Sequence, residues 1–307
     1  GSTTANITAK ALTIGGITAS NKTYNGNTTA TIDVSSATFT GLVDGDDVTV
    51  SATGVFSDKN VGTGKTVTLT ETNAGDDVAN YSITAQGSTT ANITAKALTI
   101  GGITASNKTY NGNTTATIDV SSATFTGLVD GDDVTVSATG VFSDKNVGTG
   151  KTVTLTETNA GDDVANYSIT AQGSTTANIT AKALTIGGIT ASNKTYNGNT
   201  TATIDVSSAT FTGLVDGDDV TVSATGVFSD KNVGTGKTVT LTETNAGDDV
   251  ANYSITAQGS TTANITAKAL TIGGITASNK TYNGNTTATI DVSSATFTGL
   301  VDGDDVT

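Results

Sequence analysis

Two groups of carboxylates stand at turn-like sites in the chain. Asp44, Asp46 and Asp47 form the first group, and Asp76 with Asp77 forms the second. Ca²⁺ takes about six to eight oxygen ligands of this kind, so both groups are candidates for a Ca²⁺ site that would stiffen the protein. The alternative is that Asp, Asn and Gly shape tight turns here, because neither group has the ligand spacing of an EF-hand or a nonapeptide Ca²⁺ repeat. No other cofactor is expected.

A lone Glu in a strand-like segment is the second candidate for chemistry. Glu71 falls in the inward phase of an alternating segment. A buried protonated carboxyl can promote amide formation between a Lys and an Asn, and burial lowers the pKa of the Lys. The candidates for such an isopeptide cross-link are Lys10 or Lys22 with Asn80. The alternative is a Glu that leans into solvent or pairs with a surface Lys.

Sequons and missing residue types limit the remaining chemistry. N-glycosylation triplets occur at Asn6, Asn21, Asn27 and Asn80, although such triplets also arise by chance in a chain rich in Asn and Thr. The chain has no His and no Cys, so disulfides and thiolate metal sites are excluded and the usual acid, base and nucleophile sets of enzymes are missing. We therefore expect no catalytic residues and no enzymatic activity.

All these side chains belong to a unit that is repeated without a mismatch. Gly1, Gly87, Gly173 and Gly259 begin equivalent copies of 86 residues, and the fourth copy stops at Thr307. Such a period indicates tandem repeats of one small module. The sequence has no initiator Met, no apolar leader and no long apolar run. We expect an interior section of a longer extracellular or cell-surface chain, without a membrane span in this segment.

The charge of the chain limits the classes of partner that it can bind. The formal net charge is −14, with 28 acidic and 14 basic side chains. Evenly spread negative charge keeps chains apart and soluble, whereas a nucleic-acid backbone requires clusters of Lys and Arg. We therefore expect neighbouring modules or chains as partners, and no nucleic acid.

Alternating apolar and polar residues predict short strands throughout each copy. Segments 30–34, 48–52 and 81–85 place an apolar side chain at every second residue, and Thr is abundant. Turn signals separate seven or eight such strands, and at most one helical turn fits, near 74–79. We predict an all-β immunoglobulin-like sandwich, with a β-grasp arrangement as the alternative if 74–79 is helical and packs on the sheet. Its large core side chains would be Tyr24, Phe39, Phe56 and Tyr81.

A change of phase in residues 5–14 marks the boundary between modules. Apolar residues take odd positions up to Ala9 and even positions from Leu12, which one strand cannot do without a twist or bulge. A boundary near Lys10 and Ala11 gives five parts. They are a closing strand in 1–10, complete modules in 11–96, 97–182 and 183–268, and a partial module in 269–307. The short joint lacks a flexible Gly/Ser run and predicts an extended rod, and the incomplete ends predict head-to-tail completion by adjacent chains.

Three stretches resemble a known family. They are NKTYNGNTTATI (21–32), GLVDGDDVTVSATGVFSDKNVGTGKTVTLT (41–70) and AGDDVANYSIT (74–84). Together they are similar to the YDG-type repeat, related to the MBG-type repeats, which occurs in arrays in very large bacterial surface adhesins and filamentous-haemagglutinin-like proteins. The signature Tyr-Asp-Gly reads Tyr24-Asn25-Gly26 here, which keeps a turn-forming residue beside Gly. The resemblance implies a stalk or filament displayed outside the cell, and it brings no catalytic residues.

Two functions of different classes follow. The first is a structural spacer, stalk or filament, because a rod needs length and uniform joints but no unique site. The second is a binding module in which each copy recognises a carbohydrate or a host protein weakly and the array gains by avidity. Binding tests on a single isolated copy would separate the two.

Overall fold

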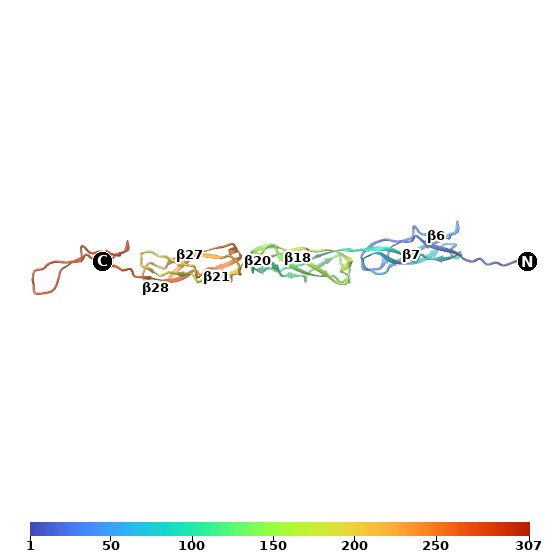
Figure 1. Cartoon of the computed structure of the whole chain (residues 1–307). Helices are drawn as coiled ribbons and strands as arrows, with labels where there is room; N and C mark the ends of the chain where they lie inside the picture. Colours follow the sequence, from blue (N-terminus) through green and yellow to red (C-terminus); the bar gives the residue numbers. More distant parts are fainter. The chain divides into compact units, whose positions relative to one another are not determined.

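The computed structural model describes all 307 residues and consists of strands, loops and short 3-10 turns (Figure 1). Two compact units divide the chain: the first holds residues 1–106, 115–143 and 150–177, and the second holds residues 107–114, 144–149 and 178–307. The structure contains no helix with the length and apolar character that crossing a membrane requires.

Ten strand segments make up the first folded module, residues 10–94, here called repeat 1. They are β1 (Lys10–Gly15), β2 (Thr18–Ala19), β3 (Lys22–Thr23), β4 (Thr29–Ala30), β5 (Ile32–Asp33), β6 (Thr38–Thr40), β7 (Thr49–Phe56), β8 (Gly62–Ala74), β9 (Tyr81–Thr84) and β10 (Ser88–Thr94), with the 3-10 turn η1 (Val78–Asn80) before β9. The sequence predicted seven or eight strands. The number is higher because residues 18–33 are broken into two-residue segments.

The same ten segments recur in the following copies. Repeat 2 contains β11 (Lys96–Gly101), β12 (Thr104–Ala105), β13 (Lys108–Thr109), β14 (Thr115–Ala116), β15 (Ile118–Asp119), β16 (Thr124–Thr126), β17 (Thr135–Phe142), β18 (Gly148–Ala160), η2 (Val164–Asn166), β19 (Tyr167–Thr170) and β20 (Ser174–Thr180). Repeat 3 contains β21 (Lys182–Gly187), β22 (Thr190–Ala191), β23 (Lys194–Thr195), β24 (Thr201–Ala202), β25 (Ile204–Asp205), β26 (Thr210–Thr212), β27 (Thr221–Phe228), β28 (Gly234–Ala246), η3 (Val250–Asn252), β29 (Tyr253–Thr256) and β30 (Ser260–Thr266). The partial fourth copy contains β31 (Thr271–Gly273), β32 (Thr276–Ala277), β33 (Ile290–Asp291) and β34 (Thr296–Thr298).

Two sheets face each other in repeat 1. One has the order β6-β1-β9 and the other β3-β10-β8-β7-β4, and side chains from both share one apolar cluster that includes Ile14, Phe56 and Val67. Repeat 3, in the second unit, has the equivalent sheets β26-β21-β29 and β23-β30-β28-β27-β24. The predicted all-β sandwich is confirmed. The β-grasp alternative needed a helix at 74–79, where only the single turn η1 is present.

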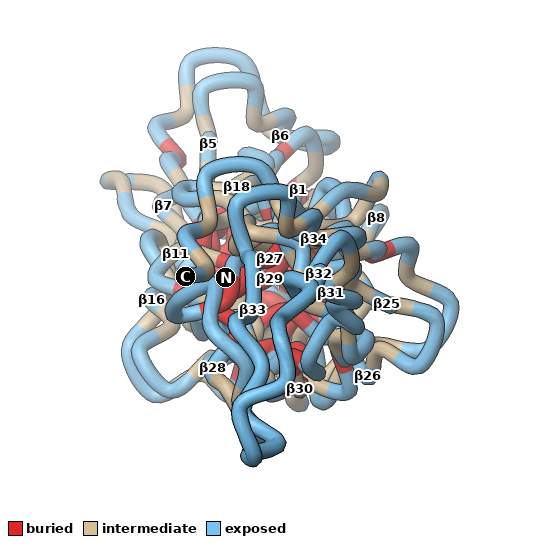
Figure 2. Tube along the Cα trace, turned by 90° about the vertical axis from the view of Figure 1, so that its left-hand side faces the viewer, coloured by how far each residue is buried: buried red, intermediate tan, exposed pale blue.

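Alternation along the strands explains why these residues form a two-layer structure. In β8 the side chains of Val67 and Leu69 are buried while their Thr neighbours are exposed, and Figure 2 shows the same alternation as short buried segments between exposed ones. Gly54 on β7 permits close packing of the layer, because a Cβ there would lie 2.4 Å from Cδ1 of Ile32. Of the predicted core residues, Tyr24, Phe56 and Tyr81 are buried, and Phe39 is half-buried against the cluster.

The strand break between repeats falls at a single residue. β10 ends at Thr94 and pairs with β8 and β3 of its own repeat, and β11 begins at Lys96, which already pairs with Tyr167 of repeat 2. The predicted module limit, after Lys96, therefore lies about one residue beyond the observed break at Ala95. Of residues 1–10, predicted as a closing strand, residues 1–9 form no strand pairing and Lys10 begins β1.

Candidate functional site: the joint between repeats

The site with the most specific geometry lies where one repeat contacts the next. In the first unit the tip of repeat 1, formed by the turns at 24–28 and 57–61, packs on repeat 2. The receiving surface, here called the socket, is formed by the loop at 127–133 and by η2 with the start of β19 (residues 163–167). Both surfaces are connections between strands: residues 57–61 close the β7 and β8 hairpin, whereas residues 127–133 and η2 lead from a strand of one sheet to a strand of the other.

The carboxylate of Asp132 is the centre of the joint. Its Oδ2 accepts hydrogen bonds from two hydroxyls, that of Tyr24 in repeat 1 at 2.8 Å and that of Tyr167 in repeat 2 at 2.6 Å. The Tyr167 hydroxyl in turn accepts a bond from the amide of Val129 at 2.9 Å, which fixes the socket loop. Only 4% of the Asp132 side chain is exposed, so its charge depends on these partners.

Lys59 supplies the opposite charge from the tip. Its Nζ lies 3.2 Å from Oδ1 of Asp132 and 2.9 Å from Oδ1 of Asp163, and it stands 6.0 Å above the ring of Tyr24. The ammonium thus bridges two carboxylates of repeat 2 from a turn of repeat 1. Because the Lys side chain is partly exposed, the pair contributes less than a fully buried one would.

Asn166 adds bonds to the backbone of the tip. Its Oδ1 accepts a hydrogen bond from the amide of Val61 at 2.9 Å, and its Nδ2 donates to Oδ1 of Asn60 at 3.2 Å. Asn166 is only 3% exposed, whereas its counterpart Asn80 in repeat 1 is exposed. Burial of this Asn is therefore a consequence of the joint.

Apolar contact makes the core continuous through the joint. Leu98, Val134 and Tyr167 of repeat 2 belong to the same cluster as the core of repeat 1, and the rings of Tyr24 and Tyr167 meet edge to face at 5.5 Å. In repeat 1 the equivalent residues form a separate small cluster of Leu12, Val48 and Tyr81. The tip of the preceding repeat is what joins the two clusters.

The joint shifts the pKa of its ionisable groups in the directions that preserve it. Burial alone would raise the pKa of Asp132, but hydrogen bonds from Tyr167, Tyr24 and Lys59 outweigh it and hold that pKa below its ordinary value. Burial, followed by the bond to Asp132, raises the pKa of Tyr167 to about 12. Hydrogen bonds to Asp163 and then Asp132 raise the pKa of Lys59. At neutral pH the tyrosines therefore remain protonated donors beside a charged carboxylate.

The second unit contains the same joint in its own residues. Tyr110 and Tyr253 donate to Oδ2 of Asp218 at 2.8 and 2.6 Å, and Lys145 contacts Asp218 at 3.2 Å and Asp249 at 3.0 Å. A third set connects repeat 3 to the partial copy: Tyr196 of repeat 3 donates to Asp304 of the partial copy at 2.7 Å, and Lys231 of repeat 3 lies 3.5 Å from the same carboxylate. The arrangement therefore has the period of the sequence.

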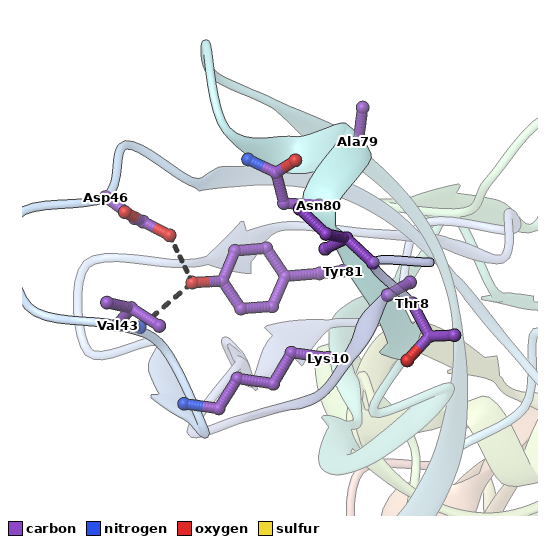
Figure 3. A pocket seen from close by; sticks show the side chains of 9 residues that line it. Thr8, Lys10, Val43, Asp46, Ala79, Asn80 and Tyr81 are labelled. Atoms are coloured by element: carbon purple, nitrogen blue, oxygen red, sulfur yellow. Dashed lines mark hydrogen bonds between the residues drawn. The ribbon is translucent and has the colours of Figure 1, made fainter. Parts of the chain in front are cut away.

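Repeat 1 shows the socket without a preceding tip. Figure 3 shows Tyr81 pointing at the loop, where its hydroxyl donates to Asp46 and accepts from the amide of Val43. A pocket of about 280 Å³ lies here, lined among others by Ile7, Lys10 and Asn80. The socket is thus formed by its own repeat, and a tip adds the second tyrosine and the lysine.

Two of the predicted Ca²⁺ ligands, Asp46 and Asp77, are hydrogen-bonded within this loop. Asp46 accepts from Tyr81, and Oδ2 of Asp77 accepts from the amide of Asp47 at 2.9 Å, while Asp44 and Asp76 are exposed. The structure gathers no group of three or more acidic side chains in a position to hold a metal ion. The oxygens of Asp46 and Asp77 thus accept bonds from donors within this loop, and the Ca²⁺ site stays a prediction.

The structure brings only some of the predicted cross-link residues together. Burial lowers the pKa of Lys22, but its Nζ donates to the carbonyls of Asn27 at 2.7 Å and Thr29 at 3.1 Å. Glu71 accepts from the amide of Gly87 at 2.9 Å, and Asn80 donates to Asp77 at 3.4 Å. Lys10 lines the pocket with Asn80, but Glu71 is not among its lining residues. Glu71 thus holds a turn of its own sheet, and the cross-link stays a prediction.

The sequons have different environments. Asn6 and Asn27 are exposed, Oδ1 of Asn21 accepts from the amide of Asn92 at 2.7 Å, and Asn80 is exposed. Asn80 becomes a joint residue in the inner copies, where Asn166 and Asn252 are each 3% exposed. A glycan at this position is therefore excluded wherever a joint is formed.

Sequence reasoning missed Lys59 and Asn60, and it assigned the positions of Asp46 and Asn80 to other roles. The Tyr-Asn-Gly signature was a usable signal, because it combines a large aromatic with Gly at a turn. Gly26 has φ +78°, and a Cβ there would lie 2.8 Å from Cγ1 of Val129. The signature is shaped by the neighbouring repeat as well as by its own turn.

A family model described as the YDG domain matches residues 8–91, 94–177, 180–263 and 266–307. The chain belongs to the YDG domain family. The four matches follow the period of the sequence, so the chain is a tandem array of YDG repeats, and the tripeptide Tyr24-Asn25-Gly26 lies at the first joint described above.

Other comparisons are distant. The crystal structure of Drosophila N-cadherin EC1-4 aligns at 8% identity and a TM-score of 0.30, over 85% of this chain and 76% of that one. Drosophila N-cadherin EC1-3 aligns at 9% identity and a TM-score of 0.23, over 81% and 98%. No curated protein matches.

Proposed function

We propose that the YDG array is a non-enzymatic structural spacer, a stalk or filament segment of a bacterial adhesin displayed outside the cell. The observation that supports this most is the recurrence of one joint, in which Asp132 is bonded by a tyrosine from each of two repeats and by Lys59. A joint of this kind restricts bending, because buried directional bonds must break before the repeats can pivot.

Uniform joints suit a spacer better than a binding protein with one unique site. Each copy presents the same tip and the same socket, so added copies extend the array without new surfaces. The negative charge of the chain favours separation from neighbouring chains. Together these features describe a stiff, soluble extension that holds another part of a protein away from its anchor.

The stiffness can be measured with spin labels. The chain has no Cys, so cysteines introduced at Thr53 of repeat 1 and Thr139 of repeat 2, both exposed, are labelled selectively. Pulsed electron resonance should give a narrow distance distribution, which Tyr24→Ala with Lys59→Ala should broaden. A broad distribution in the unchanged joint would contradict the spacer. Protease accessibility of the repeats on intact producing cells tests the extracellular location separately.

A second function has one observation in its favour. A shallow groove on the five-stranded sheet is lined by Ser51, Ala52, Thr53, Thr70 and Thr72, and the equivalent groove recurs in repeat 3. Hydroxyls of this kind can bond a sugar, so a weak carbohydrate contact repeated along the array would gain by avidity. Glycan-array binding that rises steeply from one repeat to three would favour this function over the spacer.

A further inference from the structure

Two segments of repeat 1, here called the runs, lie side by side and parallel: residues 10–23 and residues 81–94. The first run contains β1 and β3, and the second contains β9 and β10. In one sheet β1 pairs in parallel with β9, with Lys10 opposite Tyr81, and in the other sheet β3 pairs in parallel with β10, with Lys22 opposite Ile93. The separation is 71 residues in both sheets, so the two runs keep one register while they change sheets together.

Side chains continue this pairing where the runs cross between the sheets. Gly16 and Gly87 have φ of +72° and +75°, which lets each run bend at the crossing. Between them the Gln86 amide imitates a strand partner: its Oε1 accepts from the amide of Ile17 at 2.8 Å and its Nε2 donates to the Ile17 carbonyl at 2.7 Å. Further along, Oδ1 of Asn21 accepts from the backbone amide of Asn92 at 2.7 Å.

Both terminal strands of the repeat are interior strands. β1 lies between β6 and β9, and β10 lies between β3 and β8. β1 pairs with β9 through residues 10–13 and with β6 through residues 13–15, and β10 pairs with β8 through residues 88–93 and with β3 through residues 93–94. Neither terminal strand is therefore an edge strand. The parallel pairs recur as β11 with β19 and β13 with β20, and as β21 with β29 and β23 with β30.

We propose that these paired runs form a clamp that resists tension applied along the chain. Tension enters at the start of β1 and leaves at the end of β10. Because the runs point the same way, pulling must slide one along the other. The hydrogen bonds between parallel strands then share the force at the same time and do not break one after another. The single residue Ala95 passes the tension directly into β11. This inference rests on the proposed spacer function and adds to it that each repeat bears force.

Single-molecule pulling of the whole chain through its two ends tests the clamp. Each complete repeat should unfold in one step, and 86 residues at about 3.6 Å each release about 310 Å less the folded length. The unfolding force should be several-fold higher than in a second geometry, in which cysteines at Ala9 and Ala79 serve as the attachment points. Those residues lie at the same end of the β1 and β9 pair, so pulling there opens the bonds one at a time. Equal forces in the two geometries would overturn the clamp, whatever the fold stability.

A matched pair of variants locates the effect. Gln86→Ala with Gln172→Ala and Gln258→Ala removes the side-chain bridge at each crossing. Val50→Ala with its two equivalents weakens the core outside the paired runs. At comparable loss of chemical stability, the Gln variant should lower the unfolding force more than the Val variant. A larger drop in the Val variant would refute the clamp. Because the force belongs to the single repeat, this result is independent of whether the array proves to be stiff or extracellular.

Discussion

The hydroxyl of Tyr24 donates a 2.8 Å hydrogen bond to the carboxylate of Asp132, a residue 108 positions away in the next repeat. Tyr24 thus packs in the core of its own repeat and binds the socket of the next one. The bond is possible because repeat 2 presents Asp132 already oriented by its own Tyr167.

Replacing Tyr24 by Phe should weaken the first joint while leaving the ring in the core. Asp132 keeps Tyr167 and Lys59, so we expect a loss of about 1–2 kcal/mol in the free energy of unfolding, near the lower end for bonds to charged groups. Urea unfolding and hydrogen exchange of residues 127–133 measure it. Tyr282→Phe is the control, since its side chain is 92% exposed. An equal effect of both substitutions would contradict the joint.

Asn166 and Asn80 offer a second matched pair, because they occupy the same position in successive repeats. Asn166→Ala leaves the amide of Val61 without its acceptor, and we expect it to cost about 1–3 kcal/mol. Asn80→Ala changes an exposed residue and should be nearly neutral. Thermal and urea unfolding of the two variants measure the difference in their stability. Destabilisation by Asn80→Ala of the same size would show that the residue acts only within its own repeat.

The sequence predicted the sandwich because its physical cause is local. Val67 and Leu69 alternate with Thr, and this pattern alone specifies a strand with one buried face. The joint has no such local cause. In identical copies the contact of Tyr24 with Asp132 and a contact of Tyr24 with Asp46 are the same pair of residue types, so the sequence cannot separate contacts within a repeat from contacts between repeats. Only the fold, which puts Tyr24 at one end and Asp46 at the other, resolves them.

The joint should make stability depend on pH at both extremes. The pKa of Asp132 is lowered on folding, so its contribution is present above the unfolded value of about 3.9 and is lost as the pH falls through the folded value. The pKa of Tyr167 is raised to about 12. Its contribution is present below the unfolded value of about 10 and is lost as the pH rises through the folded one.

Urea midpoints measured from acid to alkaline pH should therefore show a plateau between about pH 5 and pH 9. Asp132→Asn should make the decline on the acid side shallower, because this substitution removes one of the groups that must be protonated. Ultraviolet absorbance should show that some tyrosines ionise only near pH 12, among them Tyr253, whose pKa burial and its bond to Asp218 also raise to about 12. If the urea midpoint of the Asn variant falls at acid pH as steeply as that of the unchanged chain, Asp132 does not contribute to the acid dependence.

Gly26 provides the sharpest test of the joint, because its substitution has two separable costs. With φ +78° an Ala loses about 1–2 kcal/mol for backbone conformation alone, and its Cβ would lie 2.8 Å from Cγ1 of Val129 in the next repeat. Gly45 has φ +91° with open space around a Cβ, so Gly45→Ala has only the first cost. We expect Gly26→Ala to be the more destabilising in urea unfolding. Adding Val129→Ala should recover the difference, because the shortened side chain removes the clash, and a double-mutant cycle should report this coupling. If Gly26→Ala and Gly45→Ala cost the same and Val129→Ala restores nothing, the tip and socket do not meet in solution.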